Sequence, residues 1–205
     1  LAMSENKFKK TDLKSQLLDL GLQKGATVMC HSSLSSIGKV EDGARGLVET
    51  ILEILGHEGT LVAPTFTIPI ANDPKFIFDQ VKTPSYMGAI SECVRKWPGS
   101  VRNYHPRHSI AAIGYNALEI CSKSSYTAWG ESSPMSYLMH NDAEILLIGV
   151  SYQHITFFHL CEIEMQVPYR IRSESKRKIK LINDNHSHYF SFEVFRPLKN
   201  KILHY

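Results

Sequence analysis

The sequence of 205 residues contains no long hydrophobic run. Even its longest apolar stretches are short, such as Ile145–Ile148. Because a helix that crosses a bilayer needs about 20 consecutive apolar residues, we predict no membrane span and no membrane partner. No apolar segment typical of a secretory signal follows the N-terminus, so we expect a cytoplasmic protein. Hydrophobic residues make up 43% and charged residues 21% of the chain, which excludes intrinsic disorder. We predict a single domain over residues 1–205, with a flexible N-terminus over residues 1–10.

Cysteine is scarce and several common motifs are missing. The four cysteines, at positions 30, 93, 121 and 161, form no C-x-x-C pair, which argues against a zinc knuckle, a thioredoxin-type motif and a disulfide scaffold. We predict reduced thiols that pack as small hydrophobes. The G-x-x-x-x-G-K-[ST], G-x-G-x-x-G and G-x-S-x-G motifs are absent. Their absence counts against a P-loop kinase, a Rossmann dehydrogenase and an α/β-hydrolase.

Excess positive charge is confined to the last part of the chain. Residues 170–205 carry nine Lys and Arg against three Asp and Glu, whereas residues 1–169 carry 14 against 17. The basic run 176–180 leads into the alternating run 179–182, which predicts a strand with a solvated face. We therefore expect no nucleic-acid partner, and we interpret residues 171–205 as a basic, strand-rich tail.

Hydrophobic periodicity predicts strands that alternate with helices, and hence an α/β domain with a central mixed β-sheet flanked by helices. Strands 109–114 and 144–150 are continuously apolar, which predicts burial on both faces. Residues 67–86 are predicted to form a long functional loop. Further strands are expected over 26–30 and 59–65, and a hairpin over 178–183 and 189–195. Helices are expected over 88–96, over 155–165 and after Gly43. Another helix is expected from a cap at Thr11 to Gly21, with Leu13, Leu17, Leu18 and Leu20 on one face.

A serine-rich loop, residues 31–38, follows the first predicted strand. Its hydroxyls and backbone N–H groups, close to the start of a helix, suit phosphate or pantetheine amide groups. The same serines would equally cap the next helix. The loop also leaves open a hydrolase with Ser33 or Cys30 as nucleophile beside His31, although no third catalytic member is evident.

Two further segments carry histidine. In the segment 105–109, His105 and His108 are three residues apart, but no Cys or carboxylate lies at a ligand spacing, so we expect no metal. Either His105 and Ser109 bind a loop or a ligand, or His105 is structural. In the segment 156–162, a helix would bring His159 and Glu162 face to face at i, i+3. The carboxylate would then fix the imidazole tautomer and leave the other nitrogen free to take a proton.

Together, the motifs resemble the aminoglycoside 3-N-acetyltransferase family, whose members depend on acetyl-CoA and are unrelated to the GNAT fold. The resemblance covers residues 11–170 and rests on weak motifs that occur in one order. These motifs are residues 31–38, 59–65, 83–88, 105–109 with 111–114, 130–134, 146–149, and 156–162 ending at 167–170.

This resemblance implies a non-GNAT acetyltransferase fold and transfer of an acetyl group from acetyl-CoA to a small-molecule amine. It implies that His159 is the general base and that Glu162 orients it. Thr156 or loop amides are candidates to stabilise the oxyanion. The residues implied to contact acetyl-CoA are His31, Ser32, Ser33, Leu34, Ser35, Ser85, Met87, His105 and Ser109.

The resemblance leaves the acceptor open. An aminoglycoside, and with it a role in antibiotic resistance, is the first expectation, and an amino sugar or nucleotide sugar is the alternative. A CoA-binding protein without turnover is a further alternative. Relatives usually continue past Tyr205, which leaves two alternatives: a truncated basic tail or a protein that is shorter than its relatives. A homodimer is compatible with the sequence.

Overall fold

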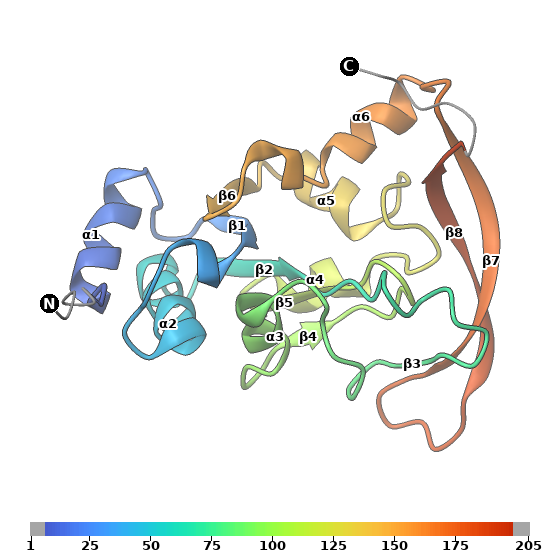
Figure 1. The fold of residues 1–205 in the computed structure, drawn as a ribbon, viewed down its shortest axis with the longest axis horizontal. Helices are drawn as coiled ribbons and strands as arrows, with labels where there is room; N and C mark the ends of the chain where they lie inside the picture. The colour runs from blue at the N-terminus through green and yellow to red at the C-terminus, as the bar shows by residue number, and fades with distance from the viewer. Residues whose placement is uncertain (1–6, 199–205) are drawn as a thin grey trace, which may run out of the picture.

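A five-stranded mixed sheet lies at the centre of the computed structural model, which describes residues 7–198 (Figure 1). Its order is β4-β5-β2-β1-β6. β1 runs parallel to β2 and β6, whereas β5 is antiparallel to β2 and β4. The predicted central mixed sheet is therefore confirmed. Its strands are β1 (Thr27–Ser32), β2 (Thr60–Pro64), β4 (Val101–Arg102), β5 (Ile110–Gly114) and β6 (Glu144–Ile148).

Helices pack on both faces of this sheet because successive strand residues point to opposite sides. Val28 and Cys30 of β1 join the core formed with α1 (Lys10–Asp19), α2 (Gly43–Leu55) and α3 (Ala89–Arg95). Met29 joins a second core, formed with α4 (Ala117–Ser122), α5 (Pro134–His140) and α6 (Phe158–Glu164). Among the residues that the structure describes, no helix is both long enough and apolar enough to cross a membrane.

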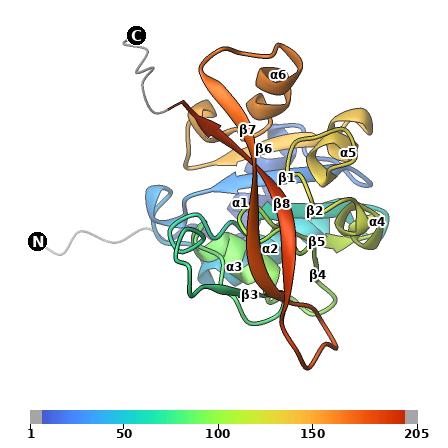
Figure 2. The ribbon, with the colours of Figure 1, turned by 90° about the vertical axis from the view of Figure 1, so that its right-hand side faces the viewer.

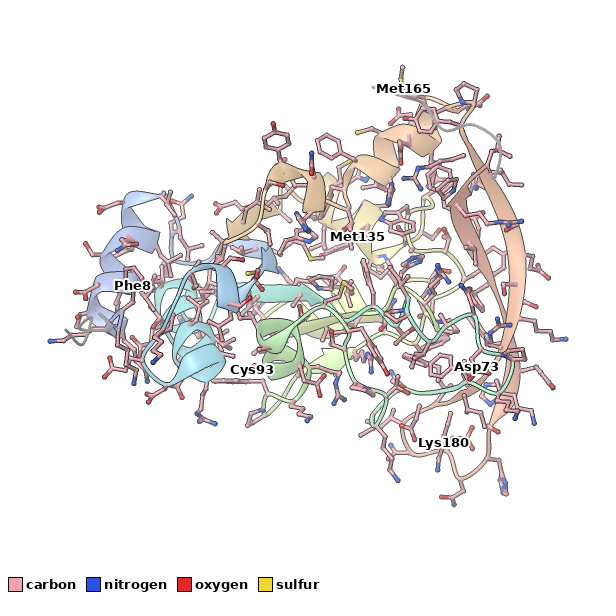
Figure 3. All side chains as sticks on the ribbon, viewed as in Figure 1. Phe8, Asp73, Cys93, Met135, Met165 and Lys180 are labelled. Atoms are coloured by element: carbon pink, nitrogen blue, oxygen red, sulfur yellow. The ribbon has the colours of Figure 1, made fainter. Side chains whose placement is uncertain are left out.

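A second sheet, of order β3-β7-β8, closes the end of the molecule opposite α1 (Figures 1 and 2). It consists of β3 (Ile77–Asp79), β7 (Arg170–Lys180) and β8 (His188–Pro197). The hairpin of β7 and β8 buries Ile179, Phe192 and Phe195 and exposes much of its charged face. Side chains fill the space between this hairpin and the central sheet (Figure 3).

The hairpin was predicted, but β7 begins eight residues earlier than the predicted strand. Residues 170–177 contain Ile171 as their only apolar side chain, so a hydrophobic pattern could not reveal this part of β7. Its pairing with β8 supplies the order that the local sequence lacks, in register from Arg170 opposite Pro197 to Ile179 opposite His188.

Several other local predictions need correction. Strand β6 is not buried on both faces, because it is an edge strand and pairs only with β1 among the described strands. Thr11 lies within α1 rather than at its cap, and Leu18 and Leu20 are exposed while Leu13 and Leu17 are buried. Helix α6 begins at Phe158 instead of residue 155. Helices α4 and α5 and the short strands β3 and β4 were not predicted.

The predicted flexible segment, residues 1–10, falls partly outside the described residues, which begin at residue 7. Within the described part, Phe8 forms an isolated parallel bridge with Val40, and Lys10 starts α1. The ammonium of Lys10 pairs with Asp42 and Glu49, which ties the start of α1 to α2.

Candidate active site

A cavity of about 230 Å³ opens where the parallel strands β1, β2 and β6 end. This is the edge at which α/β sheets place ligands. β1 contributes His31 and Ser32, the segment after β2 contributes Phe66 and Ile68, and the segment after β6 contributes Thr156 and His159. The cavity therefore combines apolar walls with several polar side chains from segments that are far apart in the sequence.

His159 and Glu162 form the pair that their i, i+3 spacing predicts. His159 Nδ1 lies 2.5 Å from Glu162 Oε2. Arg170, the first residue of β7, donates from Nε to the same carboxylate at 2.9 Å. An ionised carboxylate only accepts hydrogen bonds, so His159 Nδ1 carries the proton. The other imidazole nitrogen, Nε2, is left to accept a proton.

The ionisation of this pair suits proton transfer. Burial lowers the pKa of His159 below its ordinary value, and this effect exceeds the opposing hydrogen bond to Glu162. For Glu162, burial alone would raise the pKa, but the hydrogen bonds from His159 and Arg170 outweigh it, and the pKa is lowered. His159 is consequently a neutral imidazole beside an ionised carboxylate at pH 7. About 23% of its side chain is exposed, so a ligand can reach it.

Aromatic side chains surround the imidazole of His159. Trp129 packs edge to face against it, with 4.7 Å between the ring centroids. Phe195 of β8 contacts it from another side at 5.9 Å. The guanidinium of Arg170 lies over Phe195 at 5.4 Å, so the hairpin supports both members of the pair. Sequence reasoning assigned no role to Trp129, Arg170 or Phe195.

The cavity wall contains buried polar atoms that have no hydrogen-bond partner within residues 7–198. They are His31 Nε2, Ser32 Oγ, His108 Nδ1, Trp129 Nε1 and Thr156 Oγ1. Buried polar atoms in proteins are nearly always paired, because an unpaired one costs about 1–3 kcal/mol. Their concentration at one cavity indicates a site built to bind polar groups.

The serine-rich loop approaches the same cavity from its β1 end. The backbone N–H of Ser33 donates to the carbonyl of Ile148 at the end of β6, at 2.8 Å. Gly149 makes this approach possible, since its φ is +66° and a Cβ there would lie 2.6 Å from the carbonyl oxygen of Ser33. His31 and Ser32 line the cavity, whereas Leu34 packs against the core of α1 to α3 and Ser35 is exposed.

The hydrolase alternative finds no support in this loop. The hydroxyl of Ser33 bonds with those of Ser36, at 2.8 Å, and Ser35, at 3.3 Å, rather than with an imidazole. Cys30 is fully buried, and burial raises the pKa of its thiol to about 12. Burial also lowers the pKa of His31 to about 4. A neutral thiol in the core is a poor nucleophile.

His105 and Ser109, two residues predicted to contact the cofactor, are not brought to the cavity wall. His105 Nδ1 accepts the backbone N–H groups of Arg107, at 3.1 Å, and His108, at 3.0 Å. Nε2 therefore carries the hydrogen and donates to the carbonyl of Glu193 at 3.3 Å. With both nitrogens bonded and no exposed surface, His105 joins the loop to β8, which matches the structural alternative for this residue.

Ser109 is equally buried. Its hydroxyl donates to the carbonyl of Thr65 at 2.9 Å and accepts from Nε of Arg102 at 3.1 Å. The Arg102 guanidinium also donates to the carbonyls of Thr65 and Thr83, and so ties the loop after β2 to β4 and β5. Ser109 thus supports the loop that carries Phe66 without lining the cavity itself.

The remaining two predicted residues lie just before α3. Met87 lines the cavity. Ser85 is half-buried, its hydroxyl accepts the backbone N–H of Met87 at 3.1 Å, and its own N–H donates to Glu92 at 2.8 Å. Ser85 therefore fixes the turn that presents Met87. Of the twelve predicted site residues, His31, Ser32, Met87, Thr156 and His159 line the cavity, and Glu162 stands behind His159.

No cluster of three or more His, Cys, Asp or Glu side chains that could hold a metal occurs within the described range. The two histidines of the loop 105–109 bond and pack with protein groups. His105 Nδ1 accepts the N–H of His108, and their rings lie 5.4 Å apart as part of an aromatic cluster with Trp129 and Phe192.

Sequence comparisons find relatives of this chain in one protein family. The sequence model of a family described as aminoglycoside 3-N-acetyltransferase matches residues 29–201. Aminoglycoside N(3)-acetyltransferase IV of Salmonella sp is 33% identical over 167 residues, which are 80% of this chain and 62% of that protein. The aminoglycoside N(3')-acetyltransferase-like protein YokD of Bacillus subtilis is 31% identical over 78% of this chain and 66% of its own length.

Solved structures show the same fold. The crystal structure of YokD superposes with a TM-score of 0.80 at 27% identity, and the alignment covers 92% of this chain and 82% of that one. AAC-VIa bound to sisomicin gives 0.78 at 27% identity, over 93% of this chain and 77% of that chain. The chain spans 58–66% of the length of the curated relatives that it matches.

Proposed function

Because the chain belongs to the aminoglycoside 3-N-acetyltransferase family, we propose that it transfers the acetyl group of acetyl-CoA to an amine of an aminoglycoside, with His159 as general base. The observation that carries the proposal is the neutral imidazole of His159. Glu162 bonds one of its nitrogens, and the ring lies at the wall of a cavity rich in unpartnered polar atoms.

Acyl transfer to an amine requires one proton to be removed. An alkylammonium must lose a proton before its nitrogen can attack, and a neutral imidazole is a suitable base near pH 7. His159 Nε2 takes this proton, while Glu162 stabilises the resulting imidazolium through Nδ1. When bound, acetyl-CoA supplies the thioester: the amine nitrogen bonds to the acetyl carbon, the C–S bond breaks, and CoA leaves as the thiol with the second proton. No covalent bond to the enzyme is required.

The cavity residues fit this donor. Phe66, Ile68 and Met87 offer apolar surface for a pantetheine chain, and the unpartnered atoms of His31 and Thr156 offer hydrogen bonds to its polar groups or to the thioester oxygen. We assign donor contacts to His31, Ser32 and Met87, which line the cavity, and Ser85 presents Met87. We also assign them to Ser33, Leu34 and Ser35, which follow Ser32 along the chain and lie outside the cavity wall. Thr156 is our candidate to stabilise the developing oxyanion.

The acceptor is the less constrained part of the proposal. None of the described residues that line the cavity carries a carboxylate, although a polycation binds best among acidic groups. Relatives of this chain are named for aminoglycosides, and AAC-VIa was solved with sisomicin. An aminoglycoside is therefore tested first, and an amino sugar or a nucleotide sugar is the alternative acceptor.

The proposal is tested by mixing the protein with acetyl-CoA and a panel of aminoglycosides, amino sugars and nucleotide sugars, and following release of free thiol. His159→Ala is expected to lower kcat about 1,000-fold while calorimetry shows unchanged CoA binding. His57→Ala, at an exposed histidine beyond α2, is the matched control and should keep full activity. Near wild-type kcat in His159→Ala would refute the base assignment. CoA binding without turnover on any amine would favour the non-catalytic alternative.

A further inference from the structure

Trp129 is the one side chain of the cavity wall whose unpartnered atom can only donate a hydrogen bond. Imidazole nitrogens donate or accept according to tautomer, and a hydroxyl does both, but an indole Nε1–H has no acceptor capacity. Trp129 is only 4% exposed, and its Nε1 has no partner within the part of the chain that the structure describes. A side chain of the cavity wall therefore has an unused donor, and a ligand oxygen could satisfy it.

The position of Trp129 limits which oxygen this can be. Its ring centroid lies 4.7 Å from that of His159 and 4.5 Å from that of His108. The accepting amine must lie between His159 and the thioester carbon, since the base takes its proton during attack. The thioester oxygen consequently comes close to groups that neighbour His159, and the ring of Trp129 packs against His159 and has an unused donor.

We infer that the indole Nε1–H of Trp129 donates to the carbonyl oxygen of the acyl thioester and stabilises the negative charge that develops there. The inference rests on the proposed function, and it adds a second donor to Thr156. As the amine nitrogen bonds to the acetyl carbon, the π electron pair of the carbonyl moves onto this oxygen, and it returns when the C–S bond breaks. A preorganised donor in a buried site stabilises the charged state more than the neutral carbonyl.

The surroundings of Trp129 make the donor preorganised. The indole packs edge to face on Phe66, with 6.5 Å between centroids, and between His108 and His159. Gly130, the next residue, donates its N–H to the hydroxyl of Thr127 at 2.9 Å, which fixes the backbone beside the ring. A substrate oxygen would meet a donor that needs no further ordering.

The chain offers a direct spectroscopic test, because Trp97 and Trp129 are its only tryptophans. A ¹H–¹⁵N correlation spectrum therefore shows two indole resonances, which the variant Trp97→Phe assigns. Trp97 lies on the opposite core, under the guanidinium of Arg45. CoA and acetyl-CoA, each added to saturation, differ only in the acetyl group. We expect the Trp129 indole proton to move downfield with acetyl-CoA well beyond its shift with CoA, while the Trp97 resonance stays unchanged.

Kinetics give the second arm. Trp129→Phe keeps an aromatic ring but removes the donor, and benzothienylalanine at position 129 replaces N–H by sulfur in a ring of the same shape. Both are expected to lower kcat about 100-fold on the best amine of the panel, with the KM for acetyl-CoA changed less than about threefold. Trp97→Phe is the matched control and should keep kcat. The spectra use the unaltered residue 129, so they decide the question even if Trp129→Phe does not fold.

Three results would overturn the inference. Equal indole shifts with CoA and acetyl-CoA would assign the donor to a pantetheine amide. Binding of acetyl-CoA without any shift of the Trp129 resonance would remove this residue from the site and leave the proposed function standing. Absence of binding by either compound in calorimetry would refute the proposed function, and the inference with it.

Discussion

His105 and His159 belong to the same aromatic cluster but use their imidazoles in opposite ways. His105 is completely buried, and both of its nitrogens bond to backbone groups of its own loop and of β8. His159 has one nitrogen bonded to Glu162, and about 23% of its side chain is exposed at a cavity. The first imidazole has no capacity left for a ligand, whereas the second has one nitrogen to spare. Hydrogen-bond accounting therefore separates a structural histidine from a candidate base better than burial does.

Burial lowers the pKa of both histidines, to about 4 for His105, so a perturbed pKa alone does not distinguish them. The difference lies in the partner. A backbone carbonyl can orient an imidazole, but the ionised carboxylate of Glu162 also stabilises the charged state that proton transfer creates. The carboxylate of Glu162 therefore distinguishes His159, the proposed base, from His105, whose ring nitrogens bond only to backbone groups.

The largest expected effect is a crossed response of activity and stability. His159→Ala should lower kcat about 1,000-fold and change the unfolding temperature little. His105→Ala should do the reverse, because it leaves two N–H groups and one carbonyl unpaired in the interior. We expect a loss of about 3 kcal/mol, and thus about 9 °C in Tm, with kcat of the folded protein retained. For both variants, calorimetric unfolding measures Tm and the thiol-release assay measures kcat. A large loss of CoA affinity in folded His105→Ala would contradict the comparison and restore His105 as a binding residue.

The next effect concerns the carboxylate of Glu162, on which two donors converge, one from His159 and one from Arg170. Glu162→Gln offers one acceptor oxygen and turns an N–H₂ toward the other donor, so the imidazole loses its fixed tautomer. We expect kcat to fall about 100-fold, with the KM for acetyl-CoA nearly unchanged. Glu164→Gln, an exposed acid of the same helix, is the matched control. If Glu162→Gln kept full kcat as Glu164→Gln does, the carboxylate of Glu162 would not be needed to orient His159.

A smaller effect sharpens the role of Arg170. The active form of His159 is neutral, so kcat/KM should fall as the pH drops through a pKa below 6.5. The positive charge of Arg170 helps to lower this pKa, and Arg170→Gln should therefore move the acidic limb of the profile to higher pH. Loss of its bond to Glu162 should cost about 1.5 kcal/mol in orientation, or about tenfold in kcat. Arg172 lies on the same strand as Arg170 and pairs with Glu193 of β8, and Arg172→Gln should leave the limb in place. A limb that moved to lower pH in Arg170→Gln would reverse the electrostatic argument.

The sequence predicted the parts of this arrangement that depend on local spacing. The i, i+3 spacing of His159 and Glu162 places both on one side of α6, and the apolar runs of β1, β2 and β5 predict the central sheet. The structure places His31 and His159 at one cavity because β1 and β6 are parallel neighbours, and the segments that carry the two residues lie at or beyond the carboxyl ends of these strands.

The parts that were missed depend on contacts between distant segments. Nothing in the residues around Trp129 predicts its packing on His159, because 30 residues separate the two in the chain. Arg170 reaches Glu162 only because β7 begins there, and that start is determined by pairing with β8. The serine hydroxyls of 33 and 36 bond to each other, which side-chain composition cannot foretell.

The smallest expected effect concerns Cys161, which is a neighbour of His159 in the sequence but does not share its side of α6. Cys161 lies between His159 and Glu162 in the chain and is the one exposed cysteine of the described residues. On a helix, position 161 faces away from the side that 159 and 162 share, so Cys161 lies outside the reactive pair. Cys161→Ser should change kcat less than about twofold, and alkylation of Cys161 by iodoacetamide, verified by mass spectrometry, should leave thiol release on the best amine intact. A loss of activity that acetyl-CoA protects against would instead place this thiol beside the donor, and the reactive region would then extend around α6 to its solvent-facing side.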